Sequence, residues 1–450
     1  MEPTGETQPD ARPFEVDHRL VLSIAVPMTL GLLTTPLLGL TDTAVVGRLG
    51  QPEALAGLAI GAILFDLIYG SLSFFRTSTT GLAAQAFGRH DLREQQAVFY
   101  RAVLSALGLG LIMLLLAPVF SAYAPPLMTG DREVGDIVRS YFSIRVLSSP
   151  ATFVNYAVLG FVFGRGKAML GLALQILLNG TNIVLSIFLG LGLGWGIAGV
   201  AWGTVAAEVV AALVGLVIVM AGFSTATRPS RAEIFDATKL KQLFQLNADI
   251  LIRSLVLNGA FAVMTRVGSS FGAVTLAANA VLMNVFMLSA FFLDGLAGAA
   301  EQLTGRAVGA DYRPSFIKAL KLTAGWSFAM AGLLGLFFLA LGVPVIELLT
   351  TSEEVRQAAG IYLPWAALTG LTGALAFQMD GVFIGATWSR EMRNMMLLSF
   401  AAYCGALAVL VPTLANHGLW TALNLFLLMR GLLLLALVPR KLAQSFVAAH

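Results

Sequence analysis

The stretch LMTGDREV at residues 127–134 returns as LLTTSEEV at residues 348–355, in the second half of the chain. The same offset of 221 residues aligns three further pairs, Tyr141 with Tyr362, GFVFG (160–164) with GVFIG (381–385), and ALAGLAI (54–60) with TLAANAV (275–281). One such match between apolar segments arises easily by chance, but several at one offset indicate a duplicated unit. The sequence therefore predicts two structural repeats.

The composition identifies the solvent of these repeats. Of the 450 residues, 57% are hydrophobic and only 12% are charged. Soluble domains carry about 25% charged residues, so a soluble chain of this composition lacks the polar surface that it needs. Much of the surface must therefore face lipid. The net charge of +3 is scattered through short segments between apolar runs, which argues against a nucleic-acid partner, and the single Cys404 excludes an intramolecular disulfide.

Apolar runs of about 20 residues, the length that crosses a bilayer as an α-helix, recur along the whole chain. We predict an all-α integral membrane protein with 12 transmembrane helices, six in each repeat. The first six are expected at 20–46, 55–82, 97–123, 138–163, 168–191 and 197–222. The second six are expected at 244–267, 275–303, 317–342, 357–385, 395–415 and 417–438.

The predicted helices divide the chain into two lobes and three polar segments. The order is an N-terminal tail (1–18), an N-terminal lobe (19–223), a linker (224–243), a C-terminal lobe (244–440) and a C-terminal tail (441–450). The polar residues 1–17 are expected to be disordered. Lysine and arginine concentrate in segments that lie inside if the N-terminus is cytoplasmic, as the positive-inside rule requires. We therefore expect both termini in the cytoplasm.

Each repeat has an even number of helices, so both repeats enter the membrane from the same side. Parallel repeats of this kind are related by an axis along the membrane normal, and they are typical of transporters that work by alternating access. The sequence has no phosphate-binding GxxxxGK loop, and it has no spacing of residues that resembles a metal site. We expect an ion gradient as the energy source, with no cofactor and no bound metal.

Asp42 is the strongest candidate for carrying the coupling ion. It follows LTTPLLGLT (33–41), in which Pro36 can bend the helix, and no basic residue lies one helical turn away. A low-dielectric medium favours the protonated form of an unpaired carboxyl group. Such a group can take a proton from one side and release it when its hydration changes. The alternative is a hydrated, inert position near the outer interface.

A set of polar residues on the fifth and sixth helices is the second candidate feature. Asn179, Asn182 and Ser186 recur at helical spacing, and Thr204 follows on the next helix. An amide inside a membrane helix needs a hydrogen-bonding partner. These side chains therefore either surround the Asp42 carboxyl group or only tie helices together.

Further ionisable residues interrupt the apolar runs of the second repeat, and each is a candidate functional residue. Asp294, Glu301 and Asp380 are candidates for an ion or substrate site, although Glu301 and Asp380 can instead reach the cytoplasmic interface or close a gate. Asp249 and Arg253 are four residues apart on one helix and are predicted to neutralise each other.

Three other ionisable residues are expected to have mainly structural roles or stay undecided. Glu208 and Arg430 are expected to be paired within their own halves, and Asp66 stays open. Aromatic residues such as Phe65 and Tyr69 either line a substrate-binding region or pack between helices.

With these residues in view, the chain resembles the MATE family of multidrug and toxin extrusion transporters, and in particular its bacterial DinF-like branch. The resemblance covers nearly the whole chain. It rests on PLLGLTDTAVVGRLG (36–50), FFRTSTTGLAAQAFGR (74–89), YFSIRVLSSP (141–150), FFLDGLAGAAEQLTGRAVGA (291–310) and MDGVFIGAT (379–387). It implies a V-shaped pair of six-helix lobes in a bacterial inner (plasma) membrane. It also implies export of lipophilic, often cationic compounds in exchange for H⁺ or Na⁺.

The resemblance assigns roles to the N-terminal polar residues. The coupling carboxylate of the family corresponds to Asp42, and Thr204 corresponds to the family's sixth-helix threonine. The family's fifth-helix pattern is N-x-x-x-D, and this chain keeps Asn182 but has Ser186 in place of the aspartate. The missing second carboxylate favours protons, and Na⁺ at Asp42 stays an alternative.

The resemblance leaves the C-terminal lobe and the transported compound open. Asp294, Glu301 and Asp380 correspond to acidic positions of the DinF-like branch, where an ion or a substrate could bind. The expected partners are small amphipathic or cationic molecules and the lipid bilayer, and we expect a monomer.

Two other classes of function fit the sequence less well. A lipid-linked oligosaccharide flippase shares a two-lobed architecture but should line its centre with several basic residues, whereas the membrane arginines are spread over different helices. A membrane-embedded enzyme would need a catalytic group at membrane depth, and the four histidines fall in tails, loops or helix ends. An ion-coupled exporter is therefore the leading hypothesis.

Overall fold

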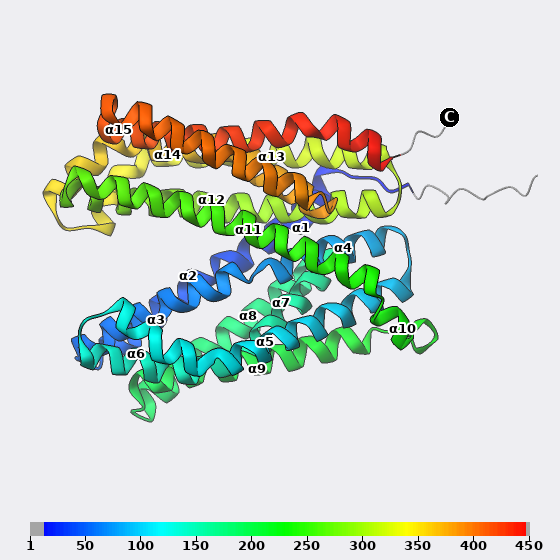
Figure 1. Ribbon diagram of the computed structural model, residues 1–450, viewed down its shortest axis with the longest axis horizontal. Helices are drawn as coiled ribbons and strands as arrows, with labels where there is room; N and C mark the ends of the chain where they lie inside the picture. The colour runs from blue at the N-terminus through cyan, green and yellow to red at the C-terminus, as the bar shows by residue number, and fades with distance from the viewer. Residues whose placement is uncertain (1–12, 447–450) are drawn as a thin grey trace, which may run out of the picture. The chain divides into compact units, whose positions relative to one another are not determined.

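The computed structural model describes residues 13–446, and all secondary structure assigned within them is helical (Figure 1). The first half contains α1 (His18–Leu33), α2 (Thr35–Gly47), α3 (Pro52–Ser71), α4 (Phe74–Gly88), α5 (Leu92–Met128), α6 (Arg132–Arg145), α7 (Ser149–Gly164), α8 (Ala168–Ile187) and α9 (Gly196–Ala221). The second half contains α10 (Arg231–Ile234), α11 (Ala237–Gly268), α12 (Ala273–Gly309), α13 (Arg313–Leu349), α14 (Glu353–Gly385) and α15 (Ser389–Ser445). Short 3₁₀ or π turns connect several of them, at Val146–Ser148, Phe188–Gly192, Thr225–Thr227 and Ser269–Phe271.

Eleven helical stretches of the described chain are long and apolar enough to cross a membrane, where the sequence predicts 12. The difference lies in α15, whose 57 residues contain both of the last two predicted helices. Ala415 interrupts this helix with a φ of 51° and a ψ of −128°, which no α-helical residue adopts. The predicted boundary between 395–415 and 417–438 falls at this break. The all-α membrane fold is therefore confirmed, and the repeat of six helices holds once α15 is divided at Ala415.

The described residues divide into two compact units. The N-unit consists of residues 30–83 and 91–247, and the C-unit consists of residues 13–29, 84–90 and 248–446. The start of α1 and the end of α4 thus group with the second half of the chain. The boundaries of the two predicted lobes at 19–223 and 244–440 stay a prediction.

Proline and glycine set the geometry of the N-unit around α2. Thr34 separates α1 from α2, and the amide of Thr34 donates to the carbonyl of Gly31 in a tight turn, at 3.2 Å. Pro36 stands in the first turn of α2, where its missing amide hydrogen is tolerated. Gly203 lets α9 approach α8 closely, because a Cβ atom there would lie 2.9 Å from the backbone nitrogen of Ser186. This approach brings the polar residues of α8 and α9 together.

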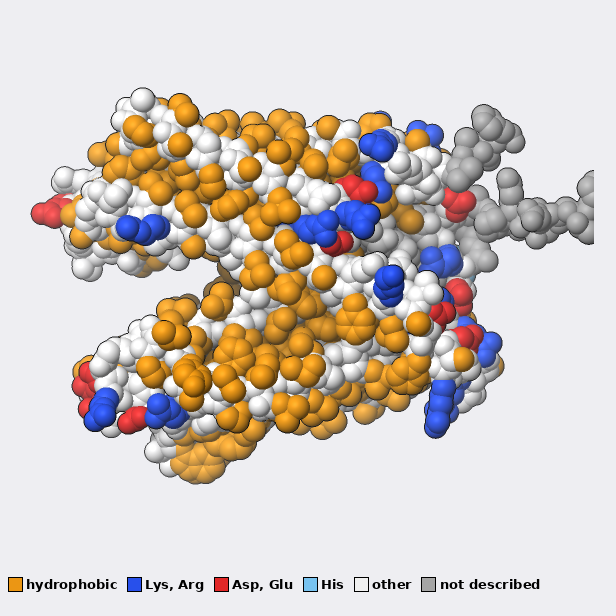
Figure 2. All heavy atoms as spheres, viewed as in Figure 1, with side chains coloured by type: hydrophobic (Ala, Val, Ile, Leu, Met, Phe, Trp, Pro, Cys, Tyr) orange, Lys and Arg blue, Asp and Glu red, His pale blue; other side chains and the backbone are white. Residues whose placement is uncertain are grey.

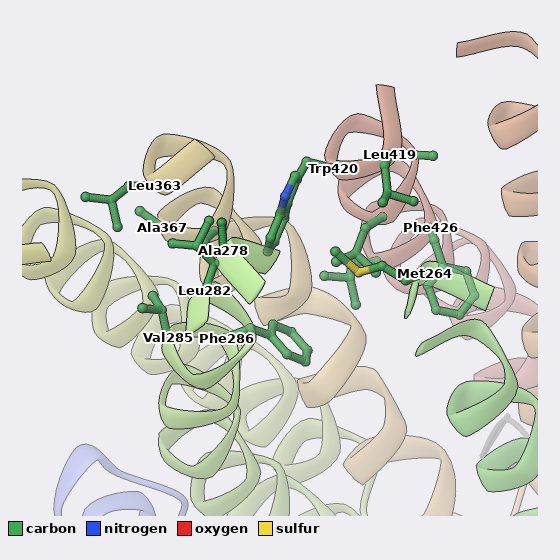
Figure 3. Close-up of a cluster of buried hydrophobic side chains, with 14 of the residues drawn as sticks. Met264, Ala278, Leu282, Val285, Phe286, Leu363, Ala367, Leu419, Trp420 and Phe426 are labelled. Atoms are coloured by element: carbon green, nitrogen blue, oxygen red, sulfur yellow. The ribbon is translucent and has the colours of Figure 1, made fainter. Parts of the chain in front are cut away.

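The C-unit has an extensive hydrophobic core in which α14 packs against α12, α13 and α15. Trp420, Leu419 and Phe426 of α15 are fully buried there, together with Ala278 and Leu282 of α12 (Figure 3). A reciprocal pair of amides supports the core near the break in α15. Asn279 and Asn416 donate to each other at 2.8 and 3.0 Å, and the indole of Trp420 donates to Asn279 at 2.9 Å.

The outer surface of both units is largely apolar, as a protein dissolved in lipid requires. Hydrophobic side chains cover most of the face visible in Figure 2, and charged side chains are few on it. Leu115, Leu127 and Leu348 are among the large side chains that are almost fully exposed. A soluble protein rarely exposes contiguous apolar surface on this scale. The chain is therefore a multi-pass membrane protein.

The prediction that residues 1–17 are disordered is wrong for residues 13–17, while residues 1–12 lie outside the described part of the chain. Val16 is fully buried, and the backbone carbonyl of Phe14 accepts a hydrogen bond from the hydroxyl group of Ser315. Glu15 forms an ion pair with Lys318 at 3.3 Å. The apolar side chains of this short segment pack against the C-unit, a tertiary contact that its polar composition did not predict.

Candidate functional site

Asp42 is half-buried on α2, within the apolar span His18–Gly47. Its carboxyl group lies within hydrogen-bonding reach of the Ser186 hydroxyl group. The positive charge of Arg145 attracts its ionised form. Among residues 13–446, Asp42 has no ion-pair partner within 4 Å, and its Oδ1 atom has no hydrogen-bond partner. A carboxyl group in this setting can exist in either protonation state without breaking a salt bridge.

Four of the five predicted N-terminal site residues lie together, and we call them the Asp42 cluster: Asp42, Asn182, Ser186 and Thr204. The amide of Asn182 donates to the hydroxyl oxygen of Thr204 at 3.0 Å, and Ser186 donates to Asn182 Oδ1 at 3.2 Å. Thr204 in turn donates to the backbone carbonyl of Val200 at 3.1 Å. The cluster therefore forms a continuous polar path from α2 through α8 to α9.

Asn179 does not belong to this cluster. Its amide donates to the hydroxyl oxygen of Thr34 at 2.5 Å, so it ties α8 to the junction between α1 and α2. Of the two alternatives for Asn179, this hydrogen bond supports a tie between helices, and its role in ion coupling stays a prediction. Thr34 was not predicted as a functional residue, because a single threonine beside a proline carries no distinguishing pattern.

A groove of about 440 Å³ runs along α2, and none of the Asp42 cluster lines it. Its walls come from α2, α8 and the following π turn, the same elements that hold Asp42 and Ser186. The lining is apolar except for one threonine and one arginine and consists of Leu37, Leu40, Thr41, Ala44, Val45, Arg48, Ile183, Ile187 and Leu191. Such a surface suits hydrocarbon, whether it belongs to a lipid chain or to a lipophilic compound.

Arg145 brings a positive charge into the interior of the N-unit. It lies at the end of α6, donates to the hydroxyl group of Tyr141 at 2.9 Å and stacks 4.6 Å from the ring centroid of Phe65. Within the described residues it has no carboxylate within 4 Å. Phe65 and Tyr69 are buried and contact each other, so they pack the interior around this guanidinium group.

The carboxylates of the C-unit differ sharply from Asp42. Asp380 is only 5% exposed, and its Oδ2 atom accepts from both Arg253 and Arg430, the latter at 2.5 Å. Arg430 is 2% exposed. Asp380 thus pairs with two arginines, the partly buried Arg253 and the buried Arg430, and does not extend to an interface. The expected structural pairing of Arg430 is confirmed.

The predicted pairing of Asp249 with Arg253 is wrong. Asp249 instead accepts from Arg393 at 2.5 Å and from the hydroxyl group of Ser389 at 2.8 Å, while Arg253 pairs with Asp380. Residues four apart on one helix can reach each other, but here each has a partner on a distant helix. Arg253 pairs with α14, and Asp249 pairs with α15. The sequence showed the charges and not these neighbours.

The other two acidic candidates of the C-unit lie in different environments. Asp294 is exposed, and its negative charge attracts the guanidinium group of Arg430. Glu301, in contrast, is only 5% exposed. Glu301 therefore does not extend toward an interface as one alternative held. Asp380 is engaged by two arginines, and a role of Asp294, Glu301 and Asp380 in ion or substrate binding stays a prediction. Within residues 13–446 no group of three or more His, Cys, Asp or Glu side chains could hold a metal ion.

Comparison with known proteins bears on both halves of the chain. The MatE family model matches residues 27–188 and again residues 250–409. The starts of the two matches are separated by nearly the offset seen within the sequence, so the duplication is confirmed.

The relatives and solved structures that resemble the chain cover almost all of it. DNA damage-inducible protein F of Escherichia coli (strain K12) is 36% identical over 93% of this chain and 91% of its own length. A probable multidrug resistance protein, NorM of Chromobacterium violaceum, is 24% identical over 93% of this chain and 92% of its own length. The solved structure of a MOP superfamily transporter from Pyrococcus furiosus shares the fold, with a TM-score of 0.86 at 17% identity over 96% of this chain and 97% of that one.

Proposed function

This chain belongs to the MatE family of multidrug and toxin extrusion transporters, within its DinF-like branch, and we propose that it exports small amphipathic or cationic organic molecules in exchange for protons. Names of its relatives that refer to multidrug resistance support the substrate class. The apolar groove beside α2 is consistent with lipophilic cargo.

The observation that carries the coupling proposal is the setting of Asp42. It is a half-buried carboxyl group inside a membrane span, and it is held by a serine rather than neutralised by an arginine. Its protonated form is neutral and suits the apolar surroundings, while its ionised form attracts a cation. Substrate and proton therefore compete for one site, and this competition links their movements through differential affinity.

The set of oxygen atoms around Asp42 favours H⁺ over Na⁺ as the coupling ion. A Na⁺ site needs several oxygen ligands, and a second carboxylate would supply charge as well. Here Ser186 occupies the place where the family pattern has aspartate, and its hydroxyl group also donates to Asn182. The amide oxygen of Asn182 accepts that hydrogen bond, and its nitrogen donates to Thr204. We propose that the site holds a proton and no metal, and that the transporter uses no cofactor.

We further propose that the protein acts as a monomer in a bacterial inner membrane with both termini in the cytoplasm. The supporting observation is the distribution of basic residues, which concentrate in alternate segments between the spans. A lipid-linked oligosaccharide flippase is the alternative. It is not favoured, because several relatives are named as multidrug resistance or export proteins and because Arg253 and Arg430 are both paired with Asp380.

Efflux from a drug-hypersusceptible bacterial host tests this function. Cells that produce the protein should lose cationic amphiphiles faster than control cells, without a requirement for Na⁺, and a protonophore should abolish the difference. Asp42→Asn should abolish it too, whereas Asp136→Asn, which alters an exposed carboxylate of α6, should not. Full protonophore-sensitive efflux by Asp42→Asn would show that another residue couples transport.

A further inference from the structure

Glu208 is an ionisable residue in the middle of α9, inside the apolar span Gly196–Ala221. It lies one helical turn after Thr204, so it shares a helix face with the last member of the Asp42 cluster. An ionised carboxylate in such a span costs several kcal/mol unless a partner compensates its charge. The proposed function assigns no role to Glu208.

The contacts of Glu208 come from hydrogen-bond donors and not from a cation. The amide of Asn155 on α7 donates to Glu208 Oε2 at 2.6 Å and to the Glu208 backbone carbonyl at 3.0 Å. Asn155 is only 5% exposed. Among the described residues no basic side chain lies within ion-pair distance of Glu208. The expected structural partner of Glu208 is thus an amide. If Glu208 were ionised, no positive charge within contact distance would compensate it.

A second neighbour, Thr152, is suited to a protonated carboxyl group. Its side chain also faces Glu208. Its hydroxyl hydrogen is directed to the backbone carbonyl of Ser148 at 3.1 Å. With the hydrogen in that direction, the hydroxyl oxygen of Thr152 is free to accept a hydrogen bond from a protonated Glu208. Asn155 and Thr152 together provide one donor and one acceptor, the pattern that a neutral carboxylic acid matches.

Charge balance in the N-unit leads to the same conclusion. Arg145 is the basic residue whose charge reaches Glu208, and the same guanidinium group also acts on Asp42 and on the exposed Asp66. Tyr69, whose hydroxyl group pairs with Ser149, and Tyr156 complete the titratable surroundings of Glu208, and Arg76 acts on Tyr156. Tyrosines ordinarily ionise only near pH 10. The charge of Arg145 therefore acts on more than one carboxyl group of the N-unit, Glu208 and Asp42 among them.

We propose that Glu208 is a second proton-binding site of the N-unit, which shares the compensating charge of Arg145 with Asp42. When Asp42 is ionised, Arg145 compensates it and Glu208 holds a proton. When Asp42 takes up a proton from water, Glu208 releases its own proton to water and becomes the compensated anion. Each step forms or breaks one O–H bond, and the number of protons is conserved. This inference rests on the proposed proton exchange and adds a second carrier to it.

Glu208→Gln separates a proton-binding role from a structural one. The amide oxygen of glutamine can accept the hydrogen bond from Asn155, so the tie between α7 and α9 is retained while the titratable proton is lost. Infrared difference spectra of the purified full-length protein, recorded between acidic and alkaline pH, report the carbonyl stretch of protonated carboxyl groups. We expect Glu208→Gln and Asp42→Asn each to remove a different component of that signal, and the double variant to remove both.

Proton release provides an independent readout with the lipophilic cation tetraphenylphosphonium as the probe. In weakly buffered detergent solution, Glu208→Gln should change the number of protons released per bound probe molecule, with an unchanged thermal unfolding midpoint as evidence of an intact fold. Glu208→Asp should restore the wild-type number.

The outcomes distinguish this inference from the proposed function. A carboxyl signal and proton release identical to wild type in Glu208→Gln would overturn the role of Glu208, whatever Asp42→Asn does. Loss of the Glu208 signal together with normal proton-driven transport by Asp42→Asn would instead contradict Asp42 as the coupling residue and leave Glu208 as a proton site.

Discussion

Removing the charge of Asp380 should destabilise the C-unit more than removing the charge of an exposed carboxylate. In Asp380→Asn the side chain keeps its shape and one acceptor oxygen, but Arg253 and Arg430 lose the anion that they share. Arg430 is 2% exposed, so water cannot replace that anion. Removing one partner of a buried ion pair costs about 3–5 kcal/mol. This corresponds to roughly two to four powers of ten in the unfolding equilibrium.

The matched control is Asp136→Asn in the N-unit. Asp136 pairs with Arg139 at 3.0 Å, but the two side chains are 74% and 48% exposed. Exposed pairs of this kind contribute about 0–1 kcal/mol. Equilibrium unfolding of the purified variants in mixed detergent and SDS micelles gives both free energies of unfolding.

A double variant tests the cause of the loss. Asp380→Asn combined with Arg253→Met removes one of the two stranded cations and should recover part of the stability. If Asp380→Asn is no more destabilising than Asp136→Asn, or if the second change brings no recovery, Asp380 does not act as the shared counter-ion of the two arginines.

Three further changes test other parts of the structure. Ser186→Asp supplies the second carboxylate of the family pattern and should make tetraphenylphosphonium transport respond to Na⁺; a folded variant that still ignores Na⁺ would show that this position does not select the ion. Gly160→Ala places a Cβ atom against the backbone of Arg76 and 2.8 Å from Thr79 Cβ, so the free energy of unfolding should fall by about 1–3 kcal/mol. The control Gly180→Ala, whose Cβ meets nothing within 4 Å, should cost nothing, and equal losses in both variants would refute the close packing. Asn416→Ala should cost about 1–3 kcal/mol by the same measurement, because it leaves a buried amide without its partner, and an unchanged stability would show that the amide pair contributes little.

The sequence predicted the helices well because each is a long apolar run bounded by polar residues. The break between α1 and α2 near Pro36 and the interruption of α15 at Ala415 both fall where the sequence predicts a bend or a boundary. Hydrophobic runs alone did not show that residues 13–17 pack against the C-unit, since that contact depends on surfaces built by distant helices.

The candidate site was predicted in part. The spacing of Asn182 and Ser186 on α8 indicated one face, and that face does meet Asp42 and Thr204. Partners across the unit could not be predicted, because helical spacing identifies neighbours only on the same helix. Asp249 therefore received the wrong partner. The amide of Asn155, which contacts Glu208, gave no sequence signal beyond a single polar residue in an apolar run.

Proton movement driven by substrate tests proton exchange at Asp42 most directly. Purified protein is placed in sodium-free liposomes that contain a pH-sensitive dye, and a gradient of tetraphenylphosphonium is imposed across the membrane. The wild type and Asp136→Asn should move protons in the direction opposite to the cation, and Asp42→Asn should move no protons. Wild-type transport of the cation without any proton movement, or undiminished proton movement in Asp42→Asn, would contradict the account.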